Sequence, residues 1–239
     1  MQQRDLVYTD GATTLRGVFA WDESRSGRRP GVLVVHSGAG LDEHPKERAL
    51  RLAELGYAAL ACDMFGDEVR GLDATQRREH MRALAEPSRL RPRAKAGLAA
   101  LLAQPEVDAG RVGAMGFCFG GGTVLELARS GADLAGVVSF HGTLATTQPA
   151  QAGEVKAKVL VCHGALDPYV PEAQLSAFMA EMRSAGVDWQ VHIHGAATHG
   201  FAHPGVHKLG VPGVEHHALT DARSWAAMQG FFAEVFAPA

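Results

Sequence analysis

Short, uninterrupted apolar runs alternate with longer amphipathic segments along most of the chain. Residues 31–35, Gly-Val-Leu-Val-Val, form such a run, which is typical of a parallel strand buried on both faces. Residues 13–21 belong to an N-terminal strand pair with a turn at Asp10-Gly11. Further strands are predicted at residues 57–62, 111–115, 135–140, 158–163 and 189–193.

Helical spacing of apolar residues appears between these strands. The predicted helices cover residues 45–55, 121–128, 171–185 and 221–236. The long helical region at 75–102 contains Pro87 and Pro92, which predict an interruption and two helices in place of one. Strands that alternate with helices indicate βαβ units, so we expect an α/β fold with a mostly parallel central sheet and helices on both faces. Without a repeat or a linker, residues 1–239 are expected to form a single domain.

Composition narrows the classes of protein to which the chain belongs. The 239 residues are 46% hydrophobic and 21% charged, with a formal net charge of -3. These values are typical of soluble globular proteins and favour neither nucleic-acid nor membrane partners. Three cysteines are an odd number, which argues for a reducing compartment. The N-terminus lacks the apolar core of a signal peptide, so we expect a cytoplasmic protein; the sequence does not indicate an oligomeric state.

The segment Gly116-Phe117-Cys118-Phe119-Gly120 separates a predicted strand from a predicted helix. A Gly-x-nucleophile-x-Gly turn in this position is the nucleophile elbow of α/β hydrolases, here with a thiol as the nucleophile. A helix N-terminus also favours the thiolate form. For this pentapeptide alone, a small buried cysteine in a glycine-rich turn is the alternative. Cys62 and Cys162 end apolar runs and are expected to be buried.

A thiol nucleophile needs a base, and the base needs an acceptor that orients it. Asp167 and His199 follow Cys118 in the chain order of α/β hydrolases, and each lies after a predicted strand. We therefore predict a catalytic triad of these three residues. The oxyanion hole is expected to use the backbone N–H groups of Phe119 and Gly38, the latter from the glycine loop after residues 31–35.

These residues resemble the dienelactone hydrolase family over nearly the whole chain. The resemblance is carried by Val34-Val35-His36, residues 55–60 leading to Asp63, residues 116–121, residues 163–168 and His199-Gly200-Phe201. It implies an α/β-hydrolase fold, hydrolysis of a small ester or lactone through an acyl-enzyme on Cys118, and no metal or organic cofactor. It also implies that His199 is the base and Asp167 its orienting acid.

Two departures from the family pattern concern the substrate. Members acting on dienelactone carry a glutamate where this chain has Ser37, and an arginine that holds the substrate carboxylate where it has His203. Candidate replacements for that arginine are Arg77, Arg78 and Arg82. A histidine replaces a bidentate arginine poorly near neutral pH, so the substrate is expected to differ from dienelactone.

Two other classes of function compete with the hydrolase. A metal-binding protein is suggested by the histidine-rich C-terminal third, although His192 and His194 share one face of a strand with no acidic or cysteine partner nearby. A non-catalytic domain that kept the fold is the other alternative, against which the intact triad argues. The loop at residues 203–217 is either a lid or a plain surface loop.

Overall fold

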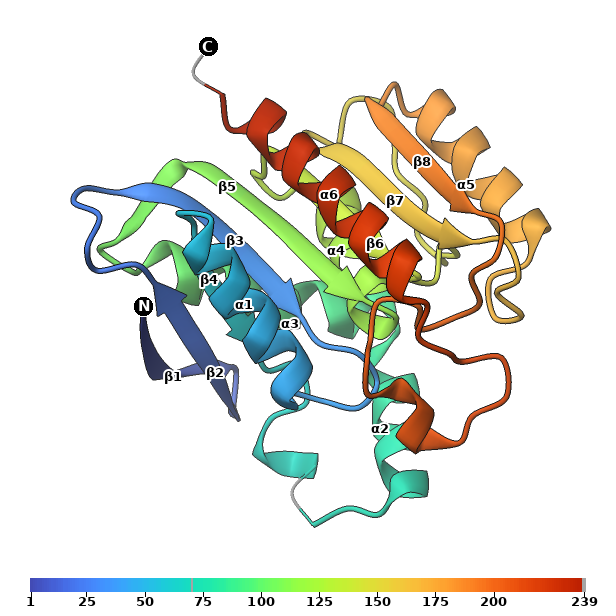
Figure 1. The fold of residues 1–239 in the computed structure, drawn as a ribbon, viewed down its shortest axis with the longest axis horizontal. Coiled ribbons are helices and arrows are strands. Elements are labelled where there is room, and N and C mark those ends of the chain that lie inside the picture. Colours follow the sequence, from blue (N-terminus) through green and yellow to red (C-terminus); the bar gives the residue numbers. More distant parts are fainter. Residues whose placement is uncertain (70, 238–239) are drawn as a thin grey trace.

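An eight-stranded sheet forms the middle layer of the computed structural model, which describes residues 1–69 and 71–237 (Figure 1). The strand order is β1-β2-β4-β3-β5-β6-β7-β8. The β1–β2 and β2–β4 pairs are antiparallel, and all pairs from β4 to β8 are parallel. The expected mostly parallel α/β sheet is therefore confirmed. The strands are β1 (Gln2–Asp10), β2 (Thr13–Trp21), β3 (Arg29–Val35), β4 (Ala58–Cys62), β5 (Val107–Phe117), β6 (Gly136–Phe140), β7 (Lys158–Gly164) and β8 (Trp189–His194).

Helices cover both faces of this sheet (Figure 1). α1 and α6 pack on one face, whereas α3, α4 and α5 pack on the other. No helix among the described residues combines the length and the apolar character needed to cross a bilayer. The helices are α1 (Glu43–Glu54), α2 (Ala74–Leu84), α3 (Pro87–Leu102), α4 (Phe119–Arg129), α5 (Glu172–Ser184) and α6 (Ala218–Val235), with short 3-10 turns η1 (Asp67–Val69) and η2 (Val206–Leu209).

The central strands are buried on both sides, which explains their continuous apolar runs. In β3, Val32 and Val34 face the core beneath α1 and α6, next to Leu52 and Phe232. The alternate residues Leu33 and Val35 face the core beneath α3, α4 and α5. Because successive side chains of a strand point to opposite faces, one apolar run supplies two cores.

The hairpin at the N-terminus turns at Gly11, whose φ is +56°. Residues 13–21 form one strand, β2, and its partner β1 lies on the other side of this turn. β1 is exposed at alternate positions and half-buried at the others, as expected for a strand at the edge of the sheet.

The helical region after residue 73 divides as expected into two helices, but only one proline marks the boundary. Pro87 is the first residue of α3. A backbone N–H at this position would have no acceptor within the helix, so its absence in proline breaks no hydrogen bond. The expected break at Pro92 is wrong, because Pro92 lies inside α3. Ser88, whose carbonyl would have accepted the Pro92 N–H, is exposed, so water can replace that hydrogen bond.

Candidate active site

Cys118 occupies the sharp turn between β5 and α4. Its backbone has φ 54° and ψ −113°, a region that residues with a side chain rarely adopt, and its N–H donates to the Phe140 carbonyl at 3.0 Å. The flanking glycines are sterically required. A Cβ on Gly116 would collide with the Gly120 carbonyl, and one on Gly120 would collide with the Val35 carbonyl. The turn therefore presents a partly exposed thiol at the carboxyl edge of the sheet.

His199 and Asp167 meet at the same edge, after β8 and β7 respectively. His199 Nδ1 lies 2.8 Å from Asp167 Oδ2, and Asp167 Oδ1 accepts a hydrogen bond from the Tyr169 N–H at 2.8 Å. The backbone of His199 is held on both sides, because its N–H donates to Gly213 O and its carbonyl accepts from Glu215 N. Both side chains are buried. The carboxylate thus fixes the orientation and tautomer of the imidazole.

The electrostatics of this cluster favour a thiolate and an imidazolium. Burial acts to raise the pKa of the Cys118 thiol, but hydrogen bonding and charge from His199, with the N–H groups of Phe119 and Gly38, outweigh it and lower the pKa. Burial acts to lower the pKa of His199, but its hydrogen bonds and charge interactions with Asp167 and Cys118 raise it to about 10. The structure therefore brings together the three predicted triad residues.

The other two cysteines lie in a different environment. Cys62, at the end of β4, and Cys162, within β7, are fully buried, and burial raises the pKa of both thiols. Among the three cysteines, only Cys118 combines partial exposure with a lowered pKa. This contrast separates a reactive thiol from two structural ones.

The glycine loop after β3 supplies the other expected oxyanion-hole donor. The N–H groups of Gly38 and Phe119 both interact with the Cys118 sulfur, so both predicted donors point toward the reacting position. Met81 of α2 packs so closely on Gly38 that a Cβ there would come within 2.8 Å of its sulfur. Ser37 Oγ accepts a hydrogen bond from the Ala39 N–H at 3.2 Å, which shapes the loop.

His36 holds this loop in place through hydrogen bonds of its ring. Its Nδ1 donates to the Ser37 carbonyl at 2.7 Å, and its Nε2 accepts from the Met64 N–H at 3.0 Å. Burial lowers the pKa of His36, so the ring is neutral and both nitrogens are satisfied. The histidine joins the loop after β3 to the segment after β4.

The arginines considered for substrate binding make local contacts on and before α2. Arg78 donates to Thr75 Oγ1 at 3.3 Å, and Arg77 donates to the Leu72 carbonyl at 3.1 Å. The side chains of Arg78 and Arg82 are exposed. Within the described residues, none of the three arginines forms an ion pair or hydrogen bond with the triad. A carboxylate clamp on these arginines stays a prediction.

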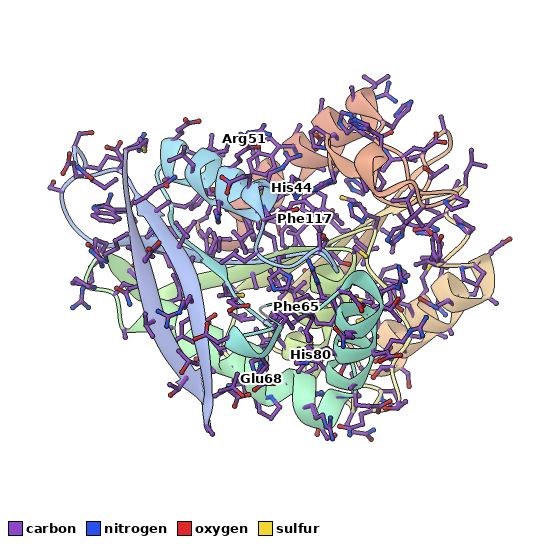
Figure 2. The ribbon with its side chains drawn as sticks, turned by 90° about the horizontal axis from the view of Figure 1, so that it is seen from below. His44, Arg51, Phe65, Glu68, His80 and Phe117 are labelled. Atoms are coloured by element: carbon purple, nitrogen blue, oxygen red, sulfur yellow. The ribbon has the colours of Figure 1, made fainter. Side chains whose placement is uncertain are left out.

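His203 lies against the N-terminal end of α1. Its Nε2 is 3.6 Å from Asp42 Oδ2, and its ring centroid is 4.3 Å from that of His44. His44 in turn packs on Phe117, with ring centroids 4.6 Å apart (Figure 2). His203 therefore contacts α1 and the residue before it. These contacts join the loop at 203–217 to the segment that follows the glycine loop.

Exposed apolar side chains lie on the loops that contain Asp167 and Pro212, and no periodic pattern in the sequence indicates them. Tyr169 stacks edge-on against His199, with ring centroids 5.2 Å apart, and its hydroxyl donates to the Pro212 carbonyl at 2.9 Å. It is 49% exposed, and its neighbours along these two loops, Leu166 and Val211, are 58% and 39% exposed. We call these three side chains the apolar rim.

A second histidine, His141, lies beside the triad and was also missed. It follows β6 directly, at the same sheet edge as the triad, and its ring centroid is 5.2 Å from that of His199. Its position after an apolar run was the signal that could have identified it.

The histidine-rich C-terminal third forms no metal centre in the described residues, where no three His, Cys, Asp or Glu side chains gather as a ligand set. His192 and His194 lie on β8, whereas His199 is paired with Asp167. The metal-binding alternative therefore has no ligand set at these positions.

One hollow of about 350 Å³ lies away from the triad, between α2, α3 and the turn of the N-terminal hairpin. The His80 ring on its wall packs edge-on against Phe65, with centroids 5.8 Å apart, and Figure 2 shows both with Glu68 nearby. The Phe65 ring in turn lies with its centroid 5.5 Å from that of the Phe119 ring. No triad residue lines this hollow, so the elbow and not the hollow marks the reactive position.

Comparison with known proteins gives a consistent result. A sequence model of the dienelactone hydrolase family matches residues 15–236. The fold superposes with a TM-score of 0.93 on the crystal structure of a dienelactone hydrolase-like promiscuous phosphotriesterase from metagenomic libraries, which is 48% identical, with 99% of each chain covered. An uncharacterized protein of Caenorhabditis elegans is 38% identical over 62% of this chain and 96% of its own. A putative carboxymethylenebutenolidase of Methylorubrum extorquens is 30% identical over 74% of this chain and 65% of its own.

Proposed function

Because the chain belongs to the dienelactone hydrolase family, we propose that it hydrolyses small esters or lactones through a covalent acyl-enzyme on Cys118. The observation that carries this proposal is the continuous contact from Asp167 through His199 to the thiol, which lowers the pKa of Cys118 and raises that of His199. Such a pair holds the nucleophile as a thiolate before substrate arrives.

In the first half-reaction the Cys118 thiolate attacks the carbonyl carbon of the ester. The N–H groups of Phe119 and Gly38, which interact with the resting sulfur, are placed to stabilise the negative oxygen of the tetrahedral intermediate. His199 then gives its proton to the leaving alkoxide as the carbon–oxygen bond breaks. The products are an alcohol and a thioester on Cys118, with a neutral His199.

In the second half-reaction neutral His199 takes a proton from water, whose oxygen attacks the thioester carbon. The carbon–sulfur bond breaks, the carboxylic acid leaves, and the thiolate again pairs with the imidazolium of His199. Asp167 stabilises the charged imidazole at both stages without taking its proton.

The resting thiolate does not depend on a carboxylate at position 37. Ser37 Oγ is engaged with the backbone of its own loop, whereas the charge that lowers the pKa of Cys118 comes from His199. We therefore propose a nucleophile that is active before substrate binds.

The apolar rim supports a substrate with an uncharged, flat or aliphatic group next to the reacting bond. Tyr169 offers exposed apolar surface in contact with the His199 ring, and Leu166 and Val211 are exposed apolar residues on the same two loops. Burying such surface favours binding. His203 is engaged with Asp42 and supplies no bidentate clamp for a carboxylate. Neutral aryl or alkyl esters thus fit the rim better than substrates with a free carboxylate.

A second candidate activity is the cleavage of phosphotriesters. It is favoured by the 48% identity, over 99% of the chain, to a structure described as a promiscuous phosphotriesterase. The same thiolate can attack phosphorus, and the same N–H groups can receive the developing charge on the phosphoryl oxygen.

The test is hydrolysis of p-nitrophenyl acetate by the Cys118→Ala variant, with Cys162→Ala as the control for a buried thiol. We expect Cys118→Ala to fall to the uncatalysed rate with an unchanged circular dichroism spectrum, and Cys162→Ala to retain activity. Phenyl acetate, its 4-carboxy derivative, an unsaturated lactone and a neutral phosphotriester complete the panel. Undiminished hydrolysis by Cys118→Ala would overturn the proposal, and a preference for the 4-carboxy ester would overturn the assigned substrate class.

A further inference from the structure

His141 is a buried polar side chain beside the triad that no step described so far uses. It is 2% exposed, and neither ring nitrogen has a hydrogen-bond partner within the described residues. Its φ is 41°, and Cys118 is the only other described residue besides glycine with a positive φ. Its backbone N–H donates to the Cys162 carbonyl at 2.9 Å, which holds this conformation at the end of β6.

Both features cost free energy. A buried polar group without a partner destabilises the fold. A left-handed backbone conformation is unfavourable for a residue with a side chain, although histidine tolerates it better than most. An apolar ring at this position would avoid the cost of the unpartnered ring nitrogens. The histidine therefore points to a hydrogen-bond partner that the imidazole gains in another state of the enzyme.

The neighbours of His141 restrict where that partner can come from. The ring packs against Phe201 and Phe117, with centroids 5.0 and 6.2 Å away, and neither phenylalanine carries a polar side-chain atom. The third ring neighbour is His199, whose two nitrogens are already engaged by Asp167 and Cys118. None of these ring neighbours offers a free hydrogen-bonding group in the resting state, and the side toward His199 is where the reaction is proposed to take place.

We propose that His141 holds the water that cleaves the acyl-enzyme, an inference that rests on the proposed thioester mechanism. Acylation turns the sulfur into a thioester and releases His199 from its contact with the thiolate. Water between the two rings directs one hydrogen to His199 and the other to a ring nitrogen of His141, which leaves an oxygen lone pair aimed at the thioester carbon. As the carbon–oxygen bond forms, the proton passes to His199, the carbon–sulfur bond breaks, and His141 returns to its resting state without having gained or lost a proton.

The protonation state of His141 agrees with this role. Burial, reinforced by the positive charge of His199, lowers the pKa of His141 well below its usual value. The ring is therefore neutral at pH 7 and keeps a lone pair that can accept a hydrogen bond from water.

Stopped-flow kinetics with p-nitrophenyl acetate separate acylation from deacylation in this enzyme. For His141→Phe we expect the acylation rate to stay within about threefold of wild type, whereas deacylation slows by about tenfold or more, so that a burst of p-nitrophenolate appears. His141→Asn tolerates the left-handed backbone and offers an oxygen acceptor, so it should recover most of the deacylation rate. His194→Phe is the matched control, because His194 also packs on Phe201 and has an unpartnered Nε2 but lies outside the triad.

Equal losses in acylation and deacylation in both His141 variants would show a structural role and overturn the proposal, as would unchanged deacylation in His141→Phe. If His141→Phe does not fold, the ratio of the two rates in His141→Asn and His141→Ala decides between the same outcomes. The Cys118→Ala variant keeps the two proposals apart. If Cys118→Ala retains activity, the proposed acyl-enzyme is wrong. If Cys118→Ala is inactive but the His141 variants deacylate at the wild-type rate, only the role of His141 is contradicted.

Discussion

At the scale of single residues, the surroundings of one cysteine thiol differ from those of the two others. Cys62 ends β4, Cys162 lies within β7, and Cys118 directly follows β5, so all three cysteines belong to the same sheet or adjoin it. Cys62 and Cys162 point into the two cores, where burial raises the pKa of each thiol. Cys118 points toward His199, whose proton and charge lower the pKa of its thiol. The difference arises from the partner and not from the residue type.

We therefore predict that iodoacetamide alkylates Cys118 alone in the folded protein. Since its pKa is lowered, the thiolate persists below the usual thiol range, and the alkylation rate at pH 7 should exceed that of a free cysteine. In His199→Gln the lowering interaction is lost, and the rate at pH 7 should fall by about tenfold or more. Mass spectrometry of the digested protein measures both the site and the rate. Equal alkylation of all three cysteines, or a rate unaffected by His199→Gln, would contradict this assignment.

At the scale of elements, α1 and α6 are joined to the loop that carries His199. Arg48 of α1 is 3% exposed and donates to both carboxylate oxygens of Asp221 of α6, each at 2.8 Å. The same guanidinium nitrogen donates to the Ala202 carbonyl at 2.7 Å, three residues after His199. One buried arginine thus connects two helices of one layer to the loop that follows His199.

Asp221→Asn tests the energetic role of this connection. The variant leaves a buried guanidinium without its counter-charge, so we expect the free energy of unfolding to fall by about 3 kcal/mol. The control is Asp133→Asn, because Asp133 is 94% exposed and pairs with Lys156 at 3.7 Å, so its loss should change stability by no more than about 0.5 kcal/mol. Urea unfolding followed by circular dichroism measures both. Similar small losses in the two variants would show that the buried pair contributes little.

At the scale of the whole molecule, the buried titratable groups determine how stability depends on pH. Burial lowers the pKa of His44 to about 3 and also lowers that of His36 and His141, so each is neutral in the fold and takes up a proton on unfolding below about pH 6.5. Stability therefore falls as the pH falls through this range. The Cys118–His199 pair keeps its shared proton in the fold up to about pH 10, because the pKa of His199 is raised to about 10 and that of Cys118 is lowered.

These titrations predict a plateau of stability near neutral pH with a steep acid limb. At pH 5 the contribution of His44 alone is on the order of 2 kcal/mol relative to pH 7.5. On the alkaline side, stability should fall again between about pH 8.5 and 10. In this range the Cys118–His199 pair keeps its proton in the folded protein, whereas the unfolded chain loses it. Urea unfolding at a series of pH values measures the profile, and His44→Phe should flatten the acid limb. If the acid limb keeps its slope in His44→Phe, the pKa of His44 is the same in the folded and the unfolded protein.

The hydrophobic pattern of the sequence was sufficient for the fold class and for the positions of most strands, because each central strand is buried on both faces and reads as a continuous apolar run. The same pattern placed Cys118, Asp167 and His199 after strands, and parallel strands end at one sheet edge. Their assignment as a triad is a prediction that the 2.8 Å contact between His199 and Asp167 supports. Local sequence could not tell that Pro92 is tolerated within α3, since that depends on the exposure of Ser88.

The tertiary structure alone decided which side chains surround these three residues. His141 meets His199, and Tyr169 meets the Pro212 carbonyl, only because separate loops converge at the carboxyl edge of the sheet. Nothing in the spacing of residues 48 and 221 indicates their ion pair. Periodicity records whether a residue faces a core, which is a property of its own element. Contacts between loops depend instead on the packing of several elements, so the reactive thiol could be identified from the sequence, whereas its surroundings could not.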